Sequence, residues 1–310
     1  MASLLTYLFR PAFLPERDIP DLSGKSTSLP DRSEKASDAI KRLEDETKKS
    51  AIFLRLDLAD LPSVRRAAES FLERESRLDL LFNNGGVMIS PNEMLTAQGH
   101  DLQFGTNVIG HFFLTELLLP ALMKTHPETK VPARIINTSS IGHQFAPGKG
   151  VEFASLKGGP ERDAWLKAAG SLMGPWYATA PDLIIRFDFL MPALRRLYGE
   201  SKLSNIFISN YFARAHADVL VSCAVHPGFI NTELGRHSGS IMQAAGSVFF
   251  YPPPMGAYTQ LWGATMASPD EINGQYLVPW GTVGKADVRA SDRELEDEVI
   301  AYIREQIKGF

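Results

Sequence analysis

The sequence predicts an α/β fold in which helices cover both faces of a parallel sheet. Short apolar runs of strand length alternate with helical segments along most of the 310 residues, which is the pattern of successive βαβ units. Polar or glycine-rich turns follow several of these runs directly, as at 83–86 and at 226–229. Ligands of such sheets bind beyond the carboxyl ends of the strands, so we expect these turns to form the functional site.

The composition is that of a globular protein with a sizeable core, with 44% hydrophobic and 22% charged residues. The net charge of −4 shows no basic excess, which argues against a nucleic-acid partner. The single cysteine, Cys223, excludes a disulfide within the chain and fits a cytoplasmic location. Neither a membrane span of ~18–20 apolar residues nor a signal peptide is expected. Peripheral contact with a membrane stays open.

Four elements are expected in the first part of the chain. A polar helix covers 33–49, and an apolar run at 51–56 has the length of a strand. A second helix begins after Asp60, its expected N-cap, and a second strand at 78–82 leads into a glycine turn. The predicted core face of that second helix consists of Val64, Ala68, Phe71 and Leu72.

The remaining chain repeats the alternation of helix and strand. Its expected elements are a helix at about 101–124, a strand at 133–137, a helix around 197–208, a strand at 219–225, a helix at about 255–266 and a last strand at 274–278.

Tyr198 and Lys202 lie one helical turn apart, so their side chains share a face with about 5–6 Å between the Cβ atoms. A nearby ammonium favours phenolate over phenol, and so lowers the phenol pKa toward the range in which it works as an acid or base. Taken alone, the pair also fits a packed aromatic ring beside a solvated lysine. Likewise, Ser140 fits a strand-end turn, and Pro227-Gly228 fits a loop breaker.

Five motifs in order along the chain resemble the short-chain dehydrogenase/reductase family, and most closely its retinol-dehydrogenase-like members. The motifs are LFNNGG at 81–86, Asn107 in FGTNVIGHFFLT, Ser140 in RIINTSS, Tyr198-x-x-x-Lys202, and HPGFINTEL at 226–234. The resemblance covers roughly 51–280. It implies a Rossmann-type doubly wound parallel sheet.

By this resemblance, Tyr198 is the general acid/base, Ser140 holds the substrate oxygen, and Lys202 lowers the Tyr198 pKa and binds the nicotinamide ribose. Asn107 would hold a water in a proton relay. The residues expected along the cofactor are Asp57 and Leu58 beside the adenine, Asn83 and Gly85 after the second strand, and Pro227, Gly228 and Thr232 at the nicotinamide end.

The resemblance implies hydride transfer between NADP or NAD and a small apolar alcohol or carbonyl substrate, with NADP favoured. The histidines have no metal-ligand spacing, so no metal site is expected. The oligomeric state is not readable from the sequence.

The chain departs from the family pattern near its start. The family opens with a strand ending in Thr-Gly-x-x-x-Gly-x-Gly, whose glycines let the backbone approach the pyrophosphate. Here a lead segment, 1–25, runs straight into a segment that resembles the helix after the second strand. A strand, a helix and a strand, about thirty residues, are therefore expected to be missing. The single domain at 26–310 would have an incomplete sheet without its first two strands.

A second departure lies between Ser140 and Tyr198. The segment 177–196 is unusually apolar and has no counterpart in the family. It fits a substrate lid or a membrane-facing flap, and it equally fits an aberrant insertion.

These departures leave two interpretations. The chain is an active NAD(P)-dependent oxidoreductase, or it is a non-catalytic remnant or scaffold protein that has lost dinucleotide binding. A defective gene model of an active enzyme would explain both departures, through a skipped coding segment and a translated non-coding one. In either case the incomplete sheet is expected to leave the strand at 78–82 with an unpaired edge, or to force the run at 51–56 in beside it. An exposed apolar edge would make the chain prone to aggregate.

Overall fold

The computed structural model describes residues 27–28, 33–49, 51–171, 192–231 and 250–310. The lead segment 1–25 and residues 177–191 of the apolar insert lie outside these ranges. The last five residues of that insert, 192–196, form the start of a long helix.

One sheet lies at the centre of the fold, with its strands in the order β1-β2-β3-β4-β5-β6. The first five strands are parallel and β6 is antiparallel to β5, which confirms the predicted α/β class with a parallel sheet. The strands are β1 Thr27–Ser28, β2 Leu80–Asn83, β3 Ala133–Thr138, β4 Leu220–Val225, β5 Tyr276–Val278 and β6 Thr282–Val283.

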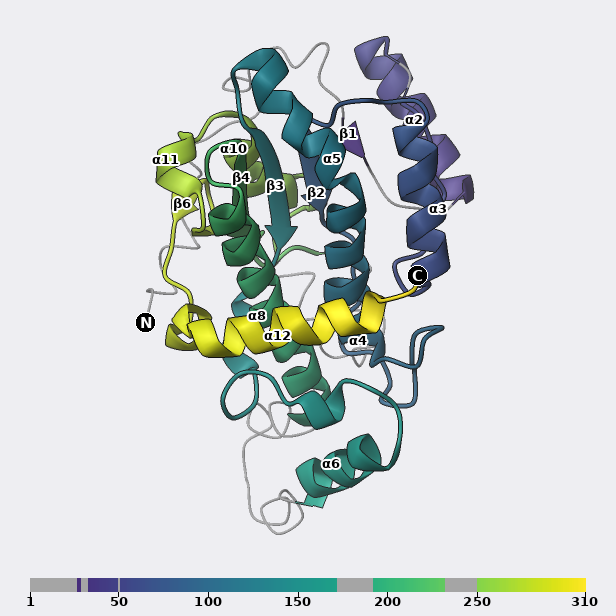
Figure 1. Ribbon diagram of the computed structural model, residues 1–310, viewed down its shortest axis with the longest axis vertical. Coiled ribbons are helices and arrows are strands. Elements are labelled where there is room, and N and C mark those ends of the chain that lie inside the picture. The colour runs from purple at the N-terminus through teal and green to yellow at the C-terminus, as the bar shows by residue number, and fades with distance from the viewer. Residues whose placement is uncertain (1–26, 29–32, 50, 172–191, 232–249) are drawn as a thin grey trace.

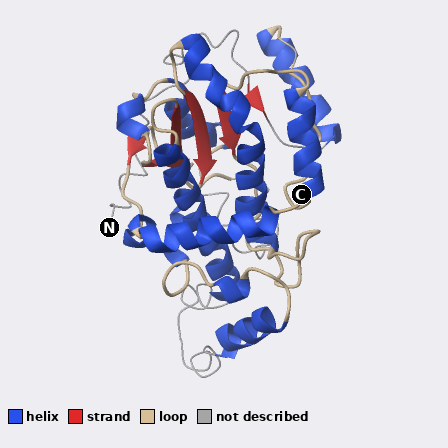
Figure 2. Cartoon of the chain, in the orientation of Figure 1, coloured by secondary structure: helices blue, strands red, loops and turns tan. Residues whose placement is uncertain are grey.

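Helices enclose the sheet (Figures 1 and 2). In Figure 1, α5 and α8 lie in front of the strands, and α12 crosses in front of them. The α-helices are α2 Ser33–Thr47, α3 Leu61–Leu72, α4 Leu102–Phe104, α5 His111–Thr129, α6 Pro160–Ser171, α8 Pro192–Ala215, α10 Tyr258–Thr265, α11 Pro269–Ile272 and α12 Arg293–Ile307. A π-helical segment, η2 Gly105–Gly110, joins α4 to α5. The 3₁₀ segments are η3 Ile141–Phe145, η4 Phe153–Ser155, η7 Pro253–Ala257 and η8 Val288–Ser291.

The sheet has a core on each face because its strands send alternate side chains to opposite sides. Leu81 and Ile135 belong to the larger core, which includes residues of α3, α5, α8 and α12. Their neighbours Leu80 and Ile136 belong to a smaller core with Cys223 and residues of α10. Two covered faces explain why β3 and β4 are buried at nearly every position.

The predicted strand at 51–56 is wrong. Among the described residues, no strand pairs with this run, although Leu54 and Leu56 pack against the larger core. Ile52 and Phe53 are exposed, at 63% and 37%. A strand needs a hydrogen-bonded neighbour, and the family strand that would lie beside this run is the one expected to be missing.

The first strand position is filled by only two residues. Thr27 and Ser28 pair with Leu80 and Leu81, so β2 is covered on this side over half of its length. The edge of β2 is therefore partly paired, by β1 and not by the run at 51–56.

The predicted helix at 101–124 is confirmed and extends to Thr129. Asp101 caps it, since its Oδ1 accepts hydrogen bonds from the backbone N–H groups of Gln103 and Phe104. By length and composition the stretch Leu102–Thr129 is able to cross a membrane, but 72% of its apolar window is buried in the fold. It is a core helix here.

The helix at 61–72 is also confirmed, with two local differences. Asp60 stands at the N-cap but makes no side-chain cap hydrogen bond. Leu72, predicted in the core, is 40% exposed.

Five helices and strands were not predicted: β1, α6, α11, β6 and α12. The signal for α12 was present, since Leu295, Val299 and Ile303 recur at helical spacing and are all buried. The two-residue β6 forms only through its pairing with β5, and so it has no local signal.

A buried ion pair holds α6, and its removal is the first testable prediction. Arg162 donates to Asp101 at 2.8 Å, and both side chains are 3% exposed. Replacing Arg162 by methionine leaves a buried carboxylate without its cation, so we expect the free energy of unfolding to fall by about 3–5 kcal/mol. Chemical denaturation measures this. Lys167→Met, at an exposed position of α6, should change it by less than about 0.5 kcal/mol; equal effects would contradict the assignment.

Candidate functional site

Ser140, Tyr198 and Lys202 meet beyond the carboxyl end of β3. Ser140 begins η3, and its Oγ accepts a hydrogen bond from the Gly142 N–H at 3.1 Å. The same hydroxyl is hydrogen-bonded to Tyr198. Lys202 Nζ lies 5.6 Å from the centroid of the Tyr198 ring. The fold thus brings together three residues that are up to 62 positions apart in the sequence.

Burial decides the protonation of this group. It raises the pKa of Tyr198 to about 12, against the opposing effect of the hydrogen bond with Ser140. It lowers the pKa of Lys202 to about 8. The net direction is upward because of burial, and the expected lowering of the Tyr198 pKa by Lys202 stays a prediction; the Lys202 ammonium donates to the Thr138 carbonyl at 2.9 Å. Near neutral pH, Tyr198 is a neutral phenol.

Hydrogen bonds from side chains to backbone carbonyls connect α8 to the end of β3. Ser139 Oγ donates to the Lys202 carbonyl at 2.7 Å, and Asn205 Nδ2 donates to the Thr138 carbonyl at 2.9 Å. Ser139 and Asn205 were not predicted as site residues. Asn205 lies seven positions after Tyr198 and so on the same helix face, which was the available signal.

Asn107 links the turn after β2 to α8. It lies in η2 with its side chain fully buried. Its Nδ2 donates to the Val87 carbonyl at 2.9 Å and to Ser201 Oγ at 3.1 Å, and its Oδ1 accepts from the Val87 N–H at 2.9 Å. The predicted role in a proton relay stays a prediction; what the structure shows is a connecting role.

Asn83 takes part in a chain of hydrogen bonds that connects β2, β3 and β4. Its Nδ2 donates to Asn137 Oδ1 at 2.9 Å and to Thr115 Oγ1 at 3.0 Å. Asn137 Nδ2 in turn donates to Ser222 Oγ at 3.1 Å. This buried chain crosses β2, β3 and β4, so Asn83 supports the site rather than lining it. Gly85 lies half-buried in the following turn.

Gly86 provides the second testable prediction. A Cβ at this position would lie 2.7 Å from Asn107 Oδ1 and 3.9 Å from Lys202 Nζ. Gly86→Ala therefore has to displace Asn107, and we expect a loss of about 1–3 kcal/mol in the free energy of unfolding. Thermal unfolding checks this. Gly85→Ala is the control, because Gly85 is not in the left-handed region; its effect should stay below about 1 kcal/mol.

The turn after β4 faces the C-terminal part of the sheet. Gly228 has φ +98°, and a Cβ there would lie 3.2 Å from Pro279 Cγ. Pro227 is half-buried beside it. Thr232, predicted at the nicotinamide end, lies outside the described residues.

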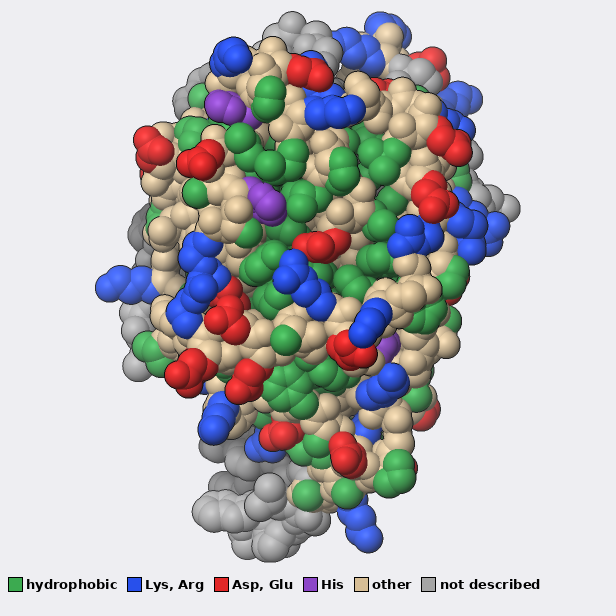
Figure 3. Space-filling view, viewed as in Figure 1, with side chains coloured by type: hydrophobic (Ala, Val, Ile, Leu, Met, Phe, Trp, Pro, Cys, Tyr) green, Lys and Arg blue, Asp and Glu red, His purple; other side chains and the backbone are tan. Residues whose placement is uncertain are grey.

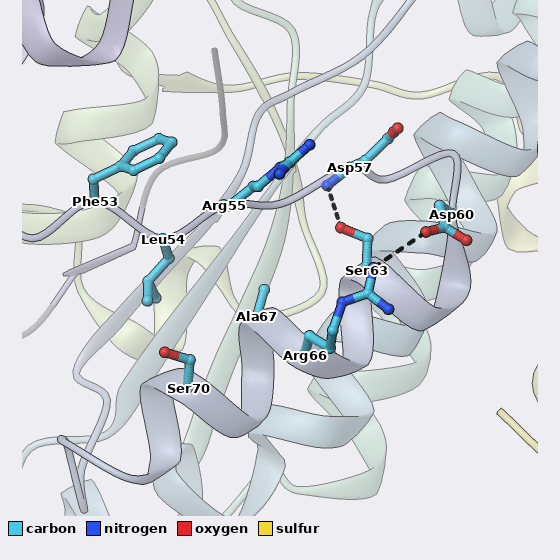
Figure 4. A pocket seen from close by; sticks show the side chains of 9 residues that line it. All are labelled: Phe53, Leu54, Arg55, Asp57, Asp60, Ser63, Arg66, Ala67 and Ser70. Carbon is cyan, nitrogen blue, oxygen red and sulfur yellow. Dashed lines mark hydrogen bonds and ion pairs between the residues drawn. The ribbon is translucent and has the colours of Figure 1, made fainter. Parts of the chain in front are cut away.

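Asp57 lies in the wall of a cavity of about 440 Å³, between the 53–57 run and α3 (Figure 4). Its N–H donates to Ser63 Oγ at 3.0 Å. None of the four predicted catalytic residues lines this cavity, so it is separate from the Ser140–Tyr198 pair. Leu58 is buried, and its carbonyl faces Gly110, where a Cβ would come within 2.4 Å.

The described residues fit one end of a dinucleotide and not the other. The close approach at Gly86, the Lys202 ammonium and the Tyr198 phenol suit a nicotinamide riboside. The pyrophosphate end has no counterpart, because the chain contains no glycine from Ser26 to Asn84. Within the described ranges, no group of three or more His, Cys, Asp or Glu side chains is placed to hold a metal ion.

Known proteins similar to this chain fall in one family. The family model for short chain dehydrogenases matches residues 23–161. A short-chain dehydrogenase/reductase of Armillaria gallica is 40% identical over 93% of this chain and 84% of its own length. The chain belongs to the short-chain dehydrogenase/reductase family. An uncharacterized oxidoreductase of Schizosaccharomyces pombe is 36% identical over 87% of this chain and 73% of its own length.

Solved structures share the family fold. A protein of unknown function from Mycobacterium paratuberculosis superimposes with a TM-score of 0.59 at 23% identity, over 96% of this chain and 98% of its own. The NADPH-bound carbonyl reductase from chicken fatty liver gives a TM-score of 0.55 at 18% identity, over 84% and 88%. At this identity the likeness concerns the fold alone. The retinol-dehydrogenase-like subtype stays a prediction.

A second Armillaria gallica short-chain dehydrogenase/reductase is longer than this chain by an amount close to the length of the segment expected to be missing. It is 37% identical over 337 aligned positions, which include 99% of this chain and 98% of the relative. Because 99% of 310 residues is about 307, about 30 positions of that relative have no counterpart here. This equals the length of the strand, helix and strand expected to be missing.

Proposed function

We propose that this chain belongs to an NAD(P)-dependent oxidoreductase that reduces the carbonyl group of an apolar substrate. The observation that carries the proposal is that Ser140, Tyr198 and Lys202 lie together: a Cβ on Gly142 would be 3.3 Å from Ser140 Oγ and 2.8 Å from Tyr198 Cε1, and Lys202 Nζ lies 5.6 Å from the Tyr198 ring centroid. Bound nicotinamide would supply the hydride. Ser140 and Tyr198 would hold the carbonyl oxygen as negative charge grows on it, and Tyr198 would give that oxygen its proton.

The protonation of the site supports the reductive direction. A phenol whose pKa is about 12 is a neutral donor at pH 7, which suits protonation of a forming alkoxide. Oxidation of an alcohol needs the phenolate as base, and burial disfavours that form.

Exposed aromatic rings support an apolar substrate. Phe145 ends η3 and is 56% exposed. Phe229 follows Pro227-Gly228 and stacks on Phe250, with ring centroids 5.9 Å apart. These segments follow the carboxyl ends of β3 and β4, where substrate would approach.

NADP is the cofactor proposed first and NAD second. The chicken carbonyl reductase and a Burkholderia cenocepacia gluconate 5-dehydrogenase of similar fold were solved with NADPH and NADP. We also propose a cytoplasmic location, with peripheral membrane contact as an alternative. No nucleic-acid partner is proposed: acidic and basic side chains alternate over the face seen in Figure 3.

A non-catalytic remnant is the second candidate, and the lack of a glycine turn from Ser26 to Asn84 favours it. Fluorescence titration with NADPH and NADH, followed by turnover assays on a series of aliphatic and aromatic aldehydes, separates the two. Micromolar binding with turnover supports the enzyme. Absence of binding and turnover up to millimolar cofactor supports the remnant for the chain as written.

A further inference from the structure

The turn that carries Ser140 is held by a segment from the far end of the sequence. His143, three residues after Ser140, is fully buried between this turn and that C-terminal segment. Its Nδ1 lies 2.6 Å from the Ser140 carbonyl oxygen, and its Nε2 accepts a hydrogen bond from the Asp287 N–H at 2.9 Å.

These two contacts assign the tautomer of His143. A backbone N–H only donates, so Nε2 is unprotonated, and a carbonyl oxygen only accepts, so Nδ1 carries the hydrogen. Burial lowers the pKa of His143, in agreement with a neutral ring. The imidazole is thus a rigid spacer between Asp287 and Ser140.

Arg289 strengthens the same connection. Its guanidinium donates to the Ala146 carbonyl at 2.7 Å and to the Gln144 carbonyl at 3.1 Å. The Asp287 carboxylate holds that guanidinium with two contacts, of 2.8 Å and 3.0 Å. Residues 287–289 are therefore connected to both ends of the turn 140–146, to Ser140 through His143 and to Ala146 through Arg289.

This turn positions the hydroxyls of Ser140 and Tyr198. Gly142 donates to Ser140 Oγ, and a Cβ on Gly142 would lie 2.8 Å from Tyr198 Cε1. Tyr198 therefore packs directly on this backbone. A shift of the turn would change the distance between the Ser140 and Tyr198 hydroxyls.

We propose that His143 is a positioning residue, which together with Arg289 couples the C-terminal segment 287–289 to the Ser140 hydroxyl. Only the expected effect of this coupling on turnover rests on the proposed function. The coupling itself is a property of the fold, and hydrogen exchange measures it without substrate or cofactor.

Two substitutions at His143 separate its contacts. His143→Asn keeps a donor near the Nδ1 position and loses the acceptor for Asp287, whereas His143→Gln keeps an acceptor near Nε2 and loses the donor to Ser140. Each substitution breaks one of the two contacts that connect Asp287 to Ser140, so we expect peptides spanning 140–147 to exchange about tenfold faster in both variants. In an active protein, kcat should fall about 10–100-fold in both variants with KM unchanged.

Arg289→Met tests the connection from the other side, with Arg293→Met as its matched control. Arg293 is half-exposed and pairs only with Glu296 and Asp297 among the described residues. Arg289→Met should speed exchange in 140–147 about tenfold, and Arg293→Met should leave it unchanged.

The outcomes are distinguishable. Unchanged exchange at 140–147 in both His143→Gln and Arg289→Met would overturn the coupling, whatever the activity. Faster exchange in a chain without any turnover would support the coupling and count against the proposed function.

Discussion

Restoring the missing segment is expected to raise the affinity for NADPH at least about a thousandfold. The change is an insertion between Lys25 and Ser26 of a family strand–helix–strand segment of about 30 residues that contains the Thr-Gly-x-x-x-Gly-x-Gly turn. A glycine-rich turn supplies several N–H groups to the pyrophosphate, and three such bonds to a charged group, at about 1.5 kcal/mol each, amount to three orders of magnitude. Fluorescence titration of both proteins with NADPH measures the difference.

An insert of the same length whose glycines are replaced by valine is the control, because it restores chain length without letting the backbone approach a phosphate. It should bind no better than the chain as written. Equal, micromolar affinity of the original chain and the insertion variant would show that the glycine turn is dispensable here.

Peptide mass spectrometry of the native source addresses the origin of the gap. If a coding segment was skipped, tryptic peptides should carry a glycine-rich sequence after Lys25, and peptides from 182–195 should be absent. Peptides that continue from Lys25 directly to Ser26, together with peptides from within 182–195, would show that the chain is real as written.

Replacing Tyr198 by phenylalanine in the protein that binds NADPH is expected to lower kcat for carbonyl reduction by about 10²–10⁴-fold. The ring is kept, and the proton donor to the alkoxide is removed. The KM for substrate should change little, because Ser140 and the packing of the ring on Gly142 remain. Steady-state kinetics with an apolar aldehyde measures both.

Tyr211→Phe is the matched control on the same helix. The Tyr211 hydroxyl accepts from Arg304, and its ring packs on Phe112, away from Ser140. Its kcat should stay within about twofold of the parent. A Tyr198→Phe protein with parental kcat would remove Tyr198 from the chemistry and leave the family membership without the proposed reaction.

The sequence determined the features that depend on short spacing. Tyr198 and Lys202 share a helix face because they are four residues apart, and Ser140 follows β3 because an apolar run ends just before it. Composition and order of motifs were enough to predict the parallel sheet and the family. The lack of a glycine turn was equally readable, since it concerns residues that are absent from the chain.

Only the tertiary structure decided what depends on distant partners. The run at 51–56 has the composition of a strand but no hydrogen-bonded neighbour among the described residues, so it forms none. The pKa of Tyr198 is raised, because burial outweighs the hydrogen bond with Ser140. The His143–Asp287 contact joins residues 144 positions apart and has no signal in either local sequence. Pairing and burial are non-local, and a pattern read along the chain contains neither.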